Sequence, residues 1–414
     1  MPDLSDEAEP NIDGAFAIGF DASNPPSRDP FNKDGNIYGR PEREVSLHFN
    51  GREIANRLCP AELKTGQPVP YRVRVQSVTG GSDVSLWVGG QPVYDKFFVP
   101  DLKPSRAGWT ANTSFSTYQS SHASHAAKLD QPTKVSVFDQ ETNDAGRHRF
   151  ERAVDLQKIT DEFGRIVGTL TLGPTPKGID PWDRLAQIWL VDDKGERFEV
   201  LRFITPYRKG WTWRVDLTRL MPLLKGRKQF KFECETWGEG WLVDFDLAYY
   251  PGALSPRPVE VRNLWNGTAV IGQPKEFPLA DFFKEQTLSL GPNKKVEFVA
   301  CVTGHGMSPN KDNAGEFHPL WRKLHVNEAA FQNNLWKQDC YLNPCRPQGG
   351  TWKYDRAGWA PGDVVTPWVQ DISQSISTSG PTKFNYEIQP YTNPTPAEGS
   401  PARHVVESYL VLWK

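Results

Sequence analysis

Three consecutive residues, Trp182, Asp183 and Arg184, combine side chains that could do chemistry. They lie between a Gly-Ile-Asp-Pro turn signal at 178–181 and a strand-like run at 186–191. Loops at the ends of a rigid β scaffold concentrate catalytic and binding groups. Such a loop would here offer a stacking plane, a proton acceptor and a fixed cation. An exposed turn with a local ion pair accounts for the same three residues equally well.

Two further carboxylates stand beside aromatic residues. Glu235 ends a strand pattern and is followed by Trp237, and Glu316 precedes Phe317 in a loop. Taken singly, each is typical of a solvated charge at a strand end. Carboxylates held close to Asp183 could not all ionise normally, so one of them would become a usable acid near neutral pH. Together the three acids predict a site between two sheets.

The segment 339–362 is too irregular for a strand and too rich in Trp, Tyr and Arg for a linker. A long loop of this kind is usually functional or tied down by contacts. Its Arg356, flanked by Trp352 and Trp359, could bind hydroxyls or a carbonyl oxygen with a rigid fork of donors. A guanidinium that stacks on tryptophan for packing alone is the alternative interpretation.

The charges of the chain nearly cancel, with 48 Lys and Arg against 50 Asp and Glu, so no nucleic-acid partner is expected. No apolar run is long enough to span a bilayer, and no membrane partner is expected either. The acidic residues 1–10 lack the apolar core of an export signal. The sequence therefore predicts either a cytoplasmic protein or a mature exported chain whose signal has been removed.

The cysteines and histidines leave two further hypotheses open. Cys340 and Cys345 are close enough in sequence to form a disulfide, which would indicate an oxidising compartment. A copper or zinc site could gather side chains with suitable donor atoms, namely His305, Met307, His318 and His325. Their spacing matches no compact metal motif, and the sequence has no phosphate-loop, dinucleotide, serine-hydrolase or zincin motif. We therefore expect neither a metal nor a cofactor.

Short β-branched or aromatic runs bounded by Gly, Pro, Asn or Asp dominate the chain and are typical of strands. Such runs lie at 71–78, 84–88, 135–137, 166–172, 187–191, 198–204, 230–235, 242–249, 296–303 and 408–413. Two segments, 218–224 and 327–337, fit two or three turns of helix. With 34 Gly and 35 Pro, the pattern favours antiparallel sandwiches or jelly rolls over a parallel sheet.

Polar or Pro-containing stretches at 116–133 and 251–258 indicate domain boundaries. We therefore predict an N-terminal β-rich accessory domain at 1–130 and two further domains at 131–255 and 256–414. The N-terminal domain would open with roughly forty polar residues before its first strand.

The chemistry-bearing residues fall in short motifs whose order resembles the peptide:N-glycosidase F family of bacterial glycoamidases. The motifs are Trp182-Asp183-Arg184, Arg202-Phe203-Ile204-Thr205-Pro206-Tyr207, Glu235-Thr236-Trp237, Val243-Asp244-Phe245-Asp246, Gly304-His305, Glu316 and Asp355-Arg356-Ala357-Gly358-Trp359. Their order is specific, whereas any one of them alone would be weak. The resemblance implies an all-β fold of two adjacent antiparallel eight-stranded jelly-roll sandwiches. The N-terminal β-rich domain resembles, in position only, an extra domain of some longer members.

The resemblance also implies roles for individual residues. Asp183 would be the principal catalytic residue, and Glu235 and Glu316 would be its two catalytic supporting acids. Residues predicted to bind substrate near the core sugars are Trp182, Arg184, Trp237, Arg356 and Trp359. The family's cysteines are replaced here by Ala314, His318 and Ala360. Cys340 thereby loses its family partner, which leaves Cys345 as an alternative.

The reaction implied is hydrolysis of the amide between an asparagine side chain and N-acetylglucosamine, which leaves an aspartate peptide and a glycosylamine. Asp183 would act at the amide, Glu316 would hold the water and Glu235 would order the first sugar. We expect a monomer, secreted or periplasmic, that acts without a metal on N-glycosylated peptides and glycoproteins. Two other classes remain open: a non-catalytic, glycan-binding double jelly roll, and a copper-dependent peptidylglycine-type monooxygenase, which has the same architecture.

Overall fold

The structure is a computed structural model, and it describes residues 14–21, 43–63, 65–103, 131–159, 162–306, 315–343, 345–346, 348–377, 379–393 and 401–414. The chain divides into two compact units. The first comprises Met1–Thr133, Asp161–Val167 and Tyr249–Ala253, and the second comprises Lys134–Thr160, Gly168–Ala248 and Leu254–Lys414. The predicted domain boundaries near residues 130 and 255 stay predictions.

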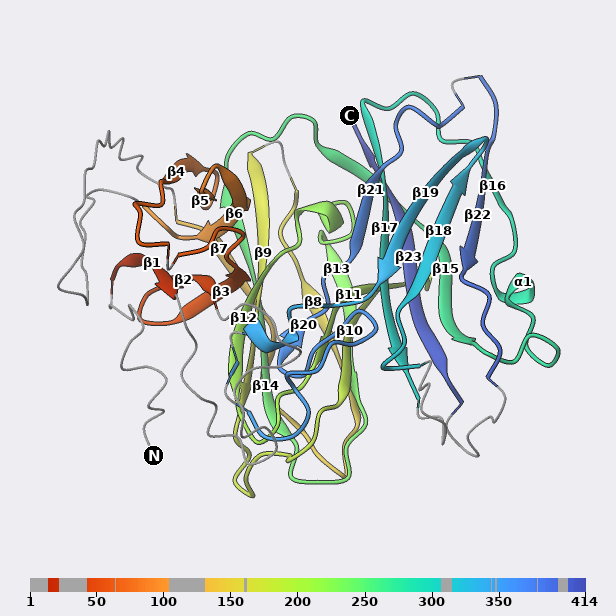
Figure 1. The fold of residues 1–414 in the computed structure, drawn as a ribbon. Helices are drawn as coiled ribbons and strands as arrows, with labels where there is room; N and C mark the ends of the chain where they lie inside the picture. The colour runs from red at the N-terminus through yellow and green to blue at the C-terminus, as the bar shows by residue number, and fades with distance from the viewer. Residues whose placement is uncertain are drawn as a thin grey trace. The chain divides into compact units, whose positions relative to one another are not determined.

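Two three-stranded antiparallel sheets make up most of the described part of the first unit (Figure 1). Their strands are β1 (Phe16–Asp21), β2 (Glu44–Phe49), β3 (Glu53–Leu58), β4 (Tyr71–Val78), β5 (Gly81–Val88) and β6 (Gln91–Pro100). Val45 and Leu86 are fully buried in its core, and Phe16 and Ile18 pack against that core. Because these apolar residues of β1 have a core to cover, the first strand begins at Phe16. The prediction of roughly forty polar residues before it is therefore wrong.

The first jelly roll consists of a five-stranded sheet, in the order β20-β11-β10-β13-β8, and a four-stranded sheet, in the order β12-β9-β14-β7. Its own strands are β7 (Thr133–Asn143), β8 (Arg149–Asp155), β9 (Phe163–Gly173), β10 (Leu185–Val191), β11 (Arg197–Ile204), β12 (Trp211–Asp216), β13 (Arg227–Cys234) and β14 (Trp241–Pro251). A short 3-10 helix, η2 (Thr218–Leu220), follows β12.

Alternation along β13 decides which side chains enter the core of the first jelly roll. Phe230, Phe232 and Cys234 are at most 2% exposed, as the period of two along a strand predicts. Phe232 meets Phe138 of β7 edge to face, which joins the two sheets. Glu235 follows Cys234 and, as predicted, does not enter this core, since its side chain is 64% exposed.

The second jelly roll pairs a sheet in the order β15-β23-β17-β21 with a sheet in the order β16-β22-β18-β19. Its strands are β15 (Pro258–Val270), β16 (Gln286–Leu288), β17 (Lys295–His305), β18 (Leu320–Val326), β19 (Ala329–Leu335), β21 (Trp368–Asp371), β22 (Thr382–Ile388) and β23 (Arg403–Trp413). The helical elements are α1 (Leu279–Phe282) and η3 (Cys340–Leu342). Each jelly roll thus has eight antiparallel strands of its own, and the predicted fold class is confirmed.

The two helical predictions fare differently. The segment 327–337 is a hairpin turn followed by β19, so the predicted helix there is wrong. Phe331 packs against the core while its neighbours along β19 are exposed, and pairing with β18 favours the strand. The segment 218–224 contains the single turn of η2 followed by hydrogen-bonded turns, which is shorter than the two or three turns predicted.

The two jelly rolls meet along β11 on one side and β17 and β23 on the other (Figure 1). Arg202 of β11 is 1% exposed and donates to the Thr303 hydroxyl and to the Val405 carbonyl, at 3.0 and 2.7 Å. Its guanidinium also pairs with Glu199 at 2.8 Å. A buried arginine with these partners fixes how the first jelly roll sits on the second.

The long segment predicted at 339–362 crosses from the second jelly roll to the first. It ends in β20 (Asp363–Val364), which pairs with Phe203 and Ile204 and so becomes the edge strand of the five-stranded sheet. The Gly362 carbonyl also accepts a hydrogen bond from the Trp213 indole at 3.1 Å. The segment is thereby tied down, which is one of the two outcomes expected of it, and it brings residues 348–351 to Tyr207 beyond the end of β11.

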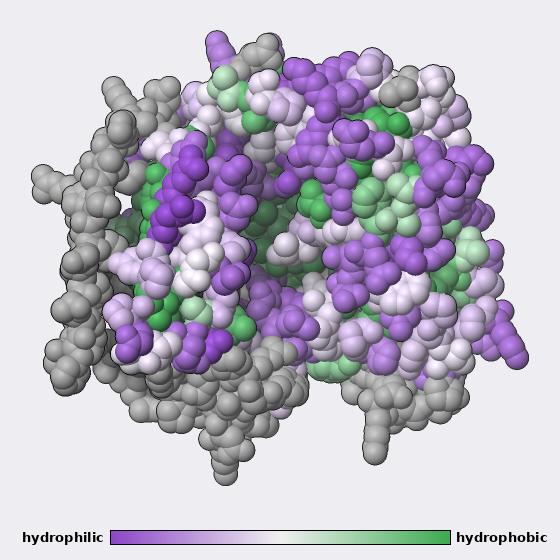
Figure 2. Space-filling view, turned by 45° about the horizontal axis from the view of Figure 1, so that its top comes forward, coloured by the Kyte–Doolittle hydropathy of each residue, from purple (hydrophilic) through white to green (hydrophobic). Residues whose placement is uncertain are grey.

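Within the described residues, no helix is long and apolar enough to cross a membrane. Hydrophilic residues prevail on the face shown in Figure 2, with hydrophobic ones scattered among them.

Candidate active site

The loop that precedes β10 is organised around a buried carboxylate, Asp180, which is 0% exposed. Its Oδ1 accepts the Trp182 backbone N–H at 2.8 Å, and its Oδ2 accepts the Thr236 hydroxyl. Arg184 approaches the same carboxylate at 3.6 Å. Asp180 therefore joins the loop of Trp182 to the loop that follows β13, and both loops carry predicted site residues.

Thr205 holds the backbone on both sides of Asp183. Its hydroxyl accepts the Arg184 N–H at 2.8 Å and donates to the Trp182 carbonyl at 3.2 Å. The Thr205 N–H in turn donates to the Arg184 carbonyl at 3.0 Å. Thr205 is 1% exposed and directly follows β11, so the position of Asp183 is set by the strand that pairs with β10.

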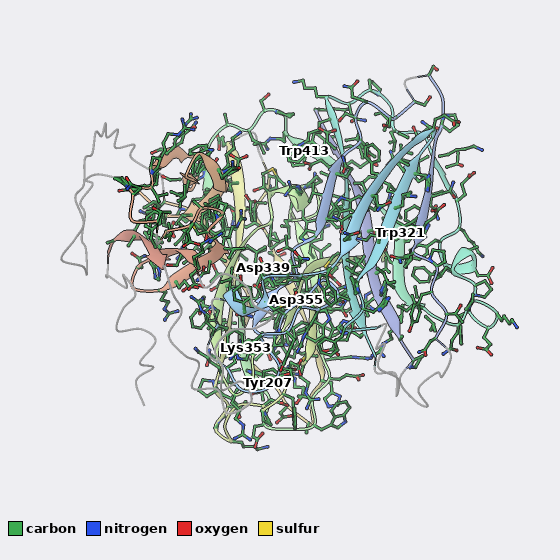
Figure 3. All side chains as sticks on the ribbon, in the orientation of Figure 1. Tyr207, Trp321, Asp339, Lys353, Asp355 and Trp413 are labelled. Atoms are coloured by element: carbon green, nitrogen blue, oxygen red, sulfur yellow. The ribbon has the colours of Figure 1, made fainter. Side chains whose placement is uncertain are left out.

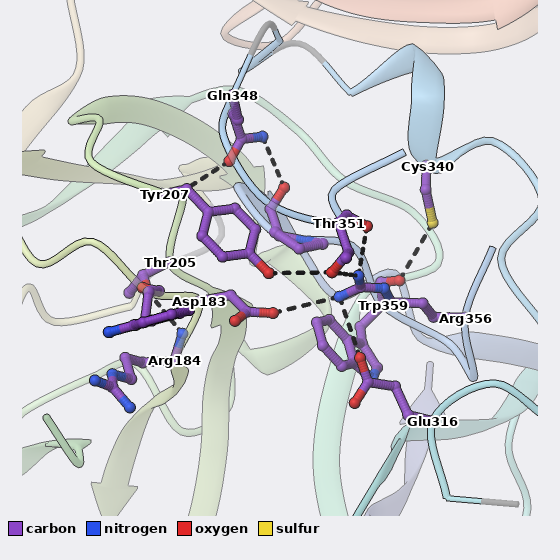
Figure 4. Close-up of polar contacts among 12 residues, drawn as sticks. Asp183, Arg184, Thr205, Tyr207, Glu316, Cys340, Gln348, Thr351, Arg356 and Trp359 are labelled. Carbon is purple, nitrogen blue, oxygen red and sulfur yellow. Dashed lines mark hydrogen bonds and ion pairs between the residues drawn. The ribbon is translucent and has the colours of Figure 1, made fainter. Parts of the chain in front are cut away.

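One guanidinium joins two of the three predicted acids (Figure 4). Nη1 of Arg356 lies 3.3 Å from Oδ2 of Asp183 and 3.3 Å from Oε1 of Glu316. Asp183 comes from the first jelly roll, whereas Glu316 and Arg356 come from the second. Two of the three acids predicted to meet are therefore brought together by an arginine at the junction of the two jelly rolls, whereas Glu235 is not.

The Arg356 side chain is held rigidly by residues of the long segment. Nη2 donates to the Thr351 hydroxyl at 2.6 Å and to the Thr351 carbonyl. The guanidinium carbon lies 4.6 Å from the ring centre of Trp359 and 5.1 Å from that of Phe317. Arg356 is 0% exposed, so the structure gives it the role of charge partner for the two acids. Its predicted direct contact with substrate stays a prediction.

Glu316 has the environment of a group that titrates near neutral pH. Burial raises its pKa to about 7, with the Arg356 charge opposing this rise and the Asp183 charge supporting it. Its side chain is 18% exposed, so water can reach the carboxylate. The expectation that one of the acids becomes usable near neutrality therefore has a physical basis in Glu316.

Tyr207 is a residue whose importance the sequence did not show. Its hydroxyl lies 3.3 Å from that of Thr351, and its backbone N–H donates to the Gln348 side chain (Figures 3 and 4). Burial raises the pKa of Tyr207 to about 12, and the neighbouring Asp183 charge adds to the rise. The phenol therefore stays protonated beside Asp183. The only sequence signal was its place at the end of the motif from Arg202.

Gly350 makes room for the Tyr207 ring. A Cβ at this position would lie 2.6 Å from the ring, and the backbone there has a φ of +69°. Both features favour glycine. The close approach brings this segment onto the first jelly roll, where Tyr207, labelled in Figure 3, contacts Thr351.

An exposed aromatic face borders Asp183. Trp182 is 59% exposed and Trp237 is 70% exposed, which is unusual for side chains of this size. The Arg184 guanidinium lies 5.0 Å from the ring centre of Trp237. Stacking planes with a cation between them suit the apolar faces and hydroxyls of sugars. The two tryptophans thus face solvent, and Arg184, whose side chain is 17% exposed, lies beneath Trp237.

Two predicted site residues stand apart from the bridged acids. Glu235 pairs with Arg149 at 3.7 Å, and the described residues include no partner that links it directly to Asp183 or Glu316. It follows Cys234, which pairs with Ala186 across β10 and β13, so it lies at the same sheet end as Arg184. Trp359 is 4% exposed and donates to the Gly304 carbonyl at 2.7 Å. The Trp359 ring packs against the Arg356 guanidinium. Its predicted contact with substrate stays a prediction.

The disulfide hypothesis for Cys340 and Cys345 is wrong in this structure. Both are buried free thiols, as are the other cysteines of the chain. The Cys340 thiol lies 3.5 Å from the carbonyls of Lys337 and Trp359. The Cys345 N–H bonds to the Asn343 side chain, which holds that turn in place. In this segment, hydrogen bonds therefore hold the backbone where a disulfide was expected.

The histidines of the metal hypothesis have separate partners. His305 stacks on Trp359, and burial lowers its pKa well below the usual range. His318 meets Tyr391, and His325 pairs with Glu387. Met307 lies outside the described residues. Within the described ranges no group of three or more His, Cys, Asp or Glu is arranged to hold a metal ion.

Asp180→Asn is expected to weaken the whole site because its amide cannot serve as the acceptor for both loops. Leaving a buried hydrogen-bonding group without its partner costs about 1–3 kcal/mol. We expect a lower Tm together with roughly a tenfold loss of kcat/KM, since 1.4 kcal/mol corresponds to a factor of ten. Thermal unfolding and steady-state kinetics measure both. Asp192→Asn is the control, because Asp192 caps a turn remote from the site and should lower only Tm.

Comparison with known proteins finds sequence similarity in the second jelly roll. Residues 281–411 match the family model described as Peptide-N-glycosidase F, C terminal. These residues form most of the second jelly roll, which is therefore similar to the C-terminal part of that family. A curated relative from Elizabethkingia miricola, the peptide-N(4)-(N-acetyl-beta-D-glucosaminyl)asparagine amidase F, is 29% identical over 239 residues. That match covers 52% of this chain and 65% of the relative's length. The predicted resemblance to the family is confirmed.

Solved structures extend the likeness in fold beyond the second jelly roll. Recombinant peptide:N-glycanase F has a TM-score of 0.61 at 23% identity, over 69% of this chain and 96% of that one. The glycosylasparaginase from Flavobacterium meningosepticum has a TM-score of 0.61 at 24% identity, with the same coverage. A structure of PNGF-II has a TM-score of 0.53 at 14% identity, over 89% of this chain and 88% of that one. The PNGF-II structure therefore matches a larger share of this chain than the other two structures do.

Proposed function

We propose that this protein is a glycoamidase, which hydrolyses the amide between an asparagine side chain and the first N-acetylglucosamine of an N-glycan. The observation that carries the proposal is the pair Asp183 and Glu316, held by one buried arginine at the junction of the two jelly rolls. The match to a relative named as an asparagine amidase supports the chemistry. The products would be an aspartate-containing peptide and a glycosylamine.

The reaction needs an activated water, a carboxylate at the scissile amide and a proton for the leaving nitrogen. We assign Glu316 to the water, because its ionised form can accept a proton close to neutral pH. Asp183 would contact the amide, with the Tyr207 phenol and Arg356 fixing its orientation. The C–N bond of the amide breaks, the water oxygen joins the acyl carbon, and its proton passes to the departing nitrogen.

The exposed rings of Trp182 and Trp237 would bind the sugar next to the amide. Trp182 precedes Asp183 in the chain, and Arg184, which packs on Trp237, offers donors to hydroxyl groups. Glu235 would order this sugar from the adjacent strand end, since its side chain is exposed there. These assignments favour the glycan lying over the first jelly roll.

A heavy-oxygen experiment tests the reaction class. The protein is incubated with an N-glycopeptide in water enriched in oxygen-18, and the peptide is analysed by mass spectrometry. We expect aspartate in place of the glycosylated asparagine, with one heavy oxygen in its carboxyl group. A peptide that keeps N-acetylglucosamine would indicate cleavage between sugars. An unchanged glycopeptide that stays bound would indicate a binding protein, and either result would reject the amidase.

The activity should rise with pH through the titration of Glu316. Its pKa of about 7 means that the ionised, base-competent form is lost below neutrality. We expect log kcat/KM to fall with unit slope below about pH 7 and to level off above it. In Glu316→Gln, the residual activity should lack this limb and be about 10²–10⁴-fold lower. The same limb in the glutamine variant would assign the titration to another group.

For its setting, we propose a secreted or periplasmic monomer that acts on N-glycosylated peptides and glycoproteins, with no nucleic-acid or membrane partner. The resemblance to bacterial glycoamidases and the near-balanced charge support this assignment. Gel filtration of the purified protein and fractionation of the producing cells would test it.

A further inference from the structure

The core of the second jelly roll contains a buried arginine that forms no ion pair with a carboxylate of the described residues. Arg322 lies on β18 between Leu320 and Leu324 and is 6% exposed. Its Nε donates to the Asn333 side chain at 2.9 Å, and its guanidinium lies 5.3 Å from the ring centre of Trp368. Among the described residues, Arg322 makes no ion pair. A buried charge of this kind is costly unless a counter-charge compensates it.

Three buried polar atoms in this core lack a well-formed hydrogen bond, and the Arg322 charge acts on the other two residues that carry them. They are Nη1 of Arg322, the Tyr386 hydroxyl and Nε2 of His404. Tyr386 is 5% exposed and lies on β22, which pairs with β18, while His404 is 2% exposed and lies on β23 of the opposite sheet. Isolated orphan groups are rare in native proteins, and a cluster of them indicates an occupant.

The charges and protonation states of these groups define the occupant's chemistry. Burial, followed by the Arg322 charge, lowers the pKa of His404 to about 3, so its imidazole is neutral and carries one N–H. Burial raises the pKa of the Tyr386 phenol, and the Arg322 guanidinium beside it opposes this rise, so the phenol keeps its proton. The cluster thus presents hydrogen-bond donors around a single positive charge.

We propose that a small monovalent anion of the halide class binds between the two sheets of the second jelly roll, on Arg322, Tyr386 and His404. A water molecule would satisfy the hydrogen bonds but would leave the arginine charge uncompensated. An anion satisfies both requirements. Because its ligands come from both sheets, it stabilises the sandwich independently of the proposed amidase activity.

Bromide locates the site directly. Crystals grown in sodium bromide are measured at the bromine absorption edge, and an anomalous peak is expected at hydrogen-bonding distance from Nη1 of Arg322. In solution, Tm is compared in sodium chloride and in sodium gluconate at equal ionic strength, because gluconate is too large to enter the core. We expect chloride to raise Tm by roughly 2–4 °C through preferential binding to the folded state.

Arg322→Met removes the charge and keeps much of the side-chain volume, an exchange that buried charges often tolerate. This variant should lose the bromide peak and the difference between chloride and gluconate. Arg227→Met is the control, because Arg227 pairs with Asp155 on the surface and its loss should leave both signals intact. If the methionine variant does not fold, the presence or absence of the bromide peak in the wild-type protein still tests whether an anion binds at this site. Density for water alone, without an anomalous signal and with equal Tm in both salts, would overturn the proposal.

Discussion

Asp183→Asn is expected to keep the fold and to lower kcat/KM for a denatured N-glycoprotein by about 10²–10⁴-fold, the contribution of a positioned acid or base. The amide has nearly the same shape as the carboxylate but carries no charge for Arg356 at 3.3 Å. Thr205 holds the backbone on both sides and is untouched by the change. Release of glycan followed by mass spectrometry measures the activity, and thermal unfolding checks the fold.

The control for this substitution is Glu233→Gln on β13. Glu233 pairs with Arg197 at the surface, so its loss should leave kcat/KM nearly unchanged. Near wild-type activity in Asp183→Asn would contradict the assignment of Asp183. Loss of activity accompanied by a large fall in Tm would instead place Asp183 among the residues that hold the two jelly rolls together.

Arg356→Met is expected to damage both stability and activity. Removing one partner of a buried ion pair leaves uncompensated charge and typically costs about 3–5 kcal/mol. Here two carboxylates, Asp183 and Glu316, would be left facing each other without the cation. Because Arg356 opposes the effect of burial on Glu316, its loss should raise the pKa of Glu316 above about 7. The rising limb of kcat/KM should therefore move to higher pH.

Arg356→Lys separates charge from geometry. Lysine keeps the positive charge but lacks the planar fork that reaches both acids and Thr351. We expect Tm to recover partly, while kcat/KM stays at least roughly tenfold below wild type. Arg227→Met at the surface is the control and should change neither quantity. A methionine variant with an unshifted pH limb would show that Arg356 does not tune Glu316.

Local patterning accounts for much of the fold. The period of two at 230–235 placed Phe230 and Phe232 in the core and Glu235 outside it. This prediction needs no distant residues, because successive side chains along a strand point to opposite faces of the sheet. The same reasoning failed at 327–337, where Ala, Gln and Asn suit a helix as well as a strand. There, pairing with β18 decided the outcome, and such pairing depends on residues far away in the sequence.

The order of the motifs, without any structure, singled out Asp183, Glu316 and Arg356 and the exposed Trp182 and Trp237. Only the tertiary structure decided that Arg356 spans both acids, since Arg356 and Asp183 are 173 residues apart.

The same holds for the supporting residues of the site. Thr205 and Tyr207 looked like ordinary members of a motif, and Asp180 looked like a turn residue. Their roles arise where β11, the loop before β10 and the segment ending in β20 meet. Those contacts are made largely by backbone groups and short polar side chains, which every sequence contains, so no local pattern marks them.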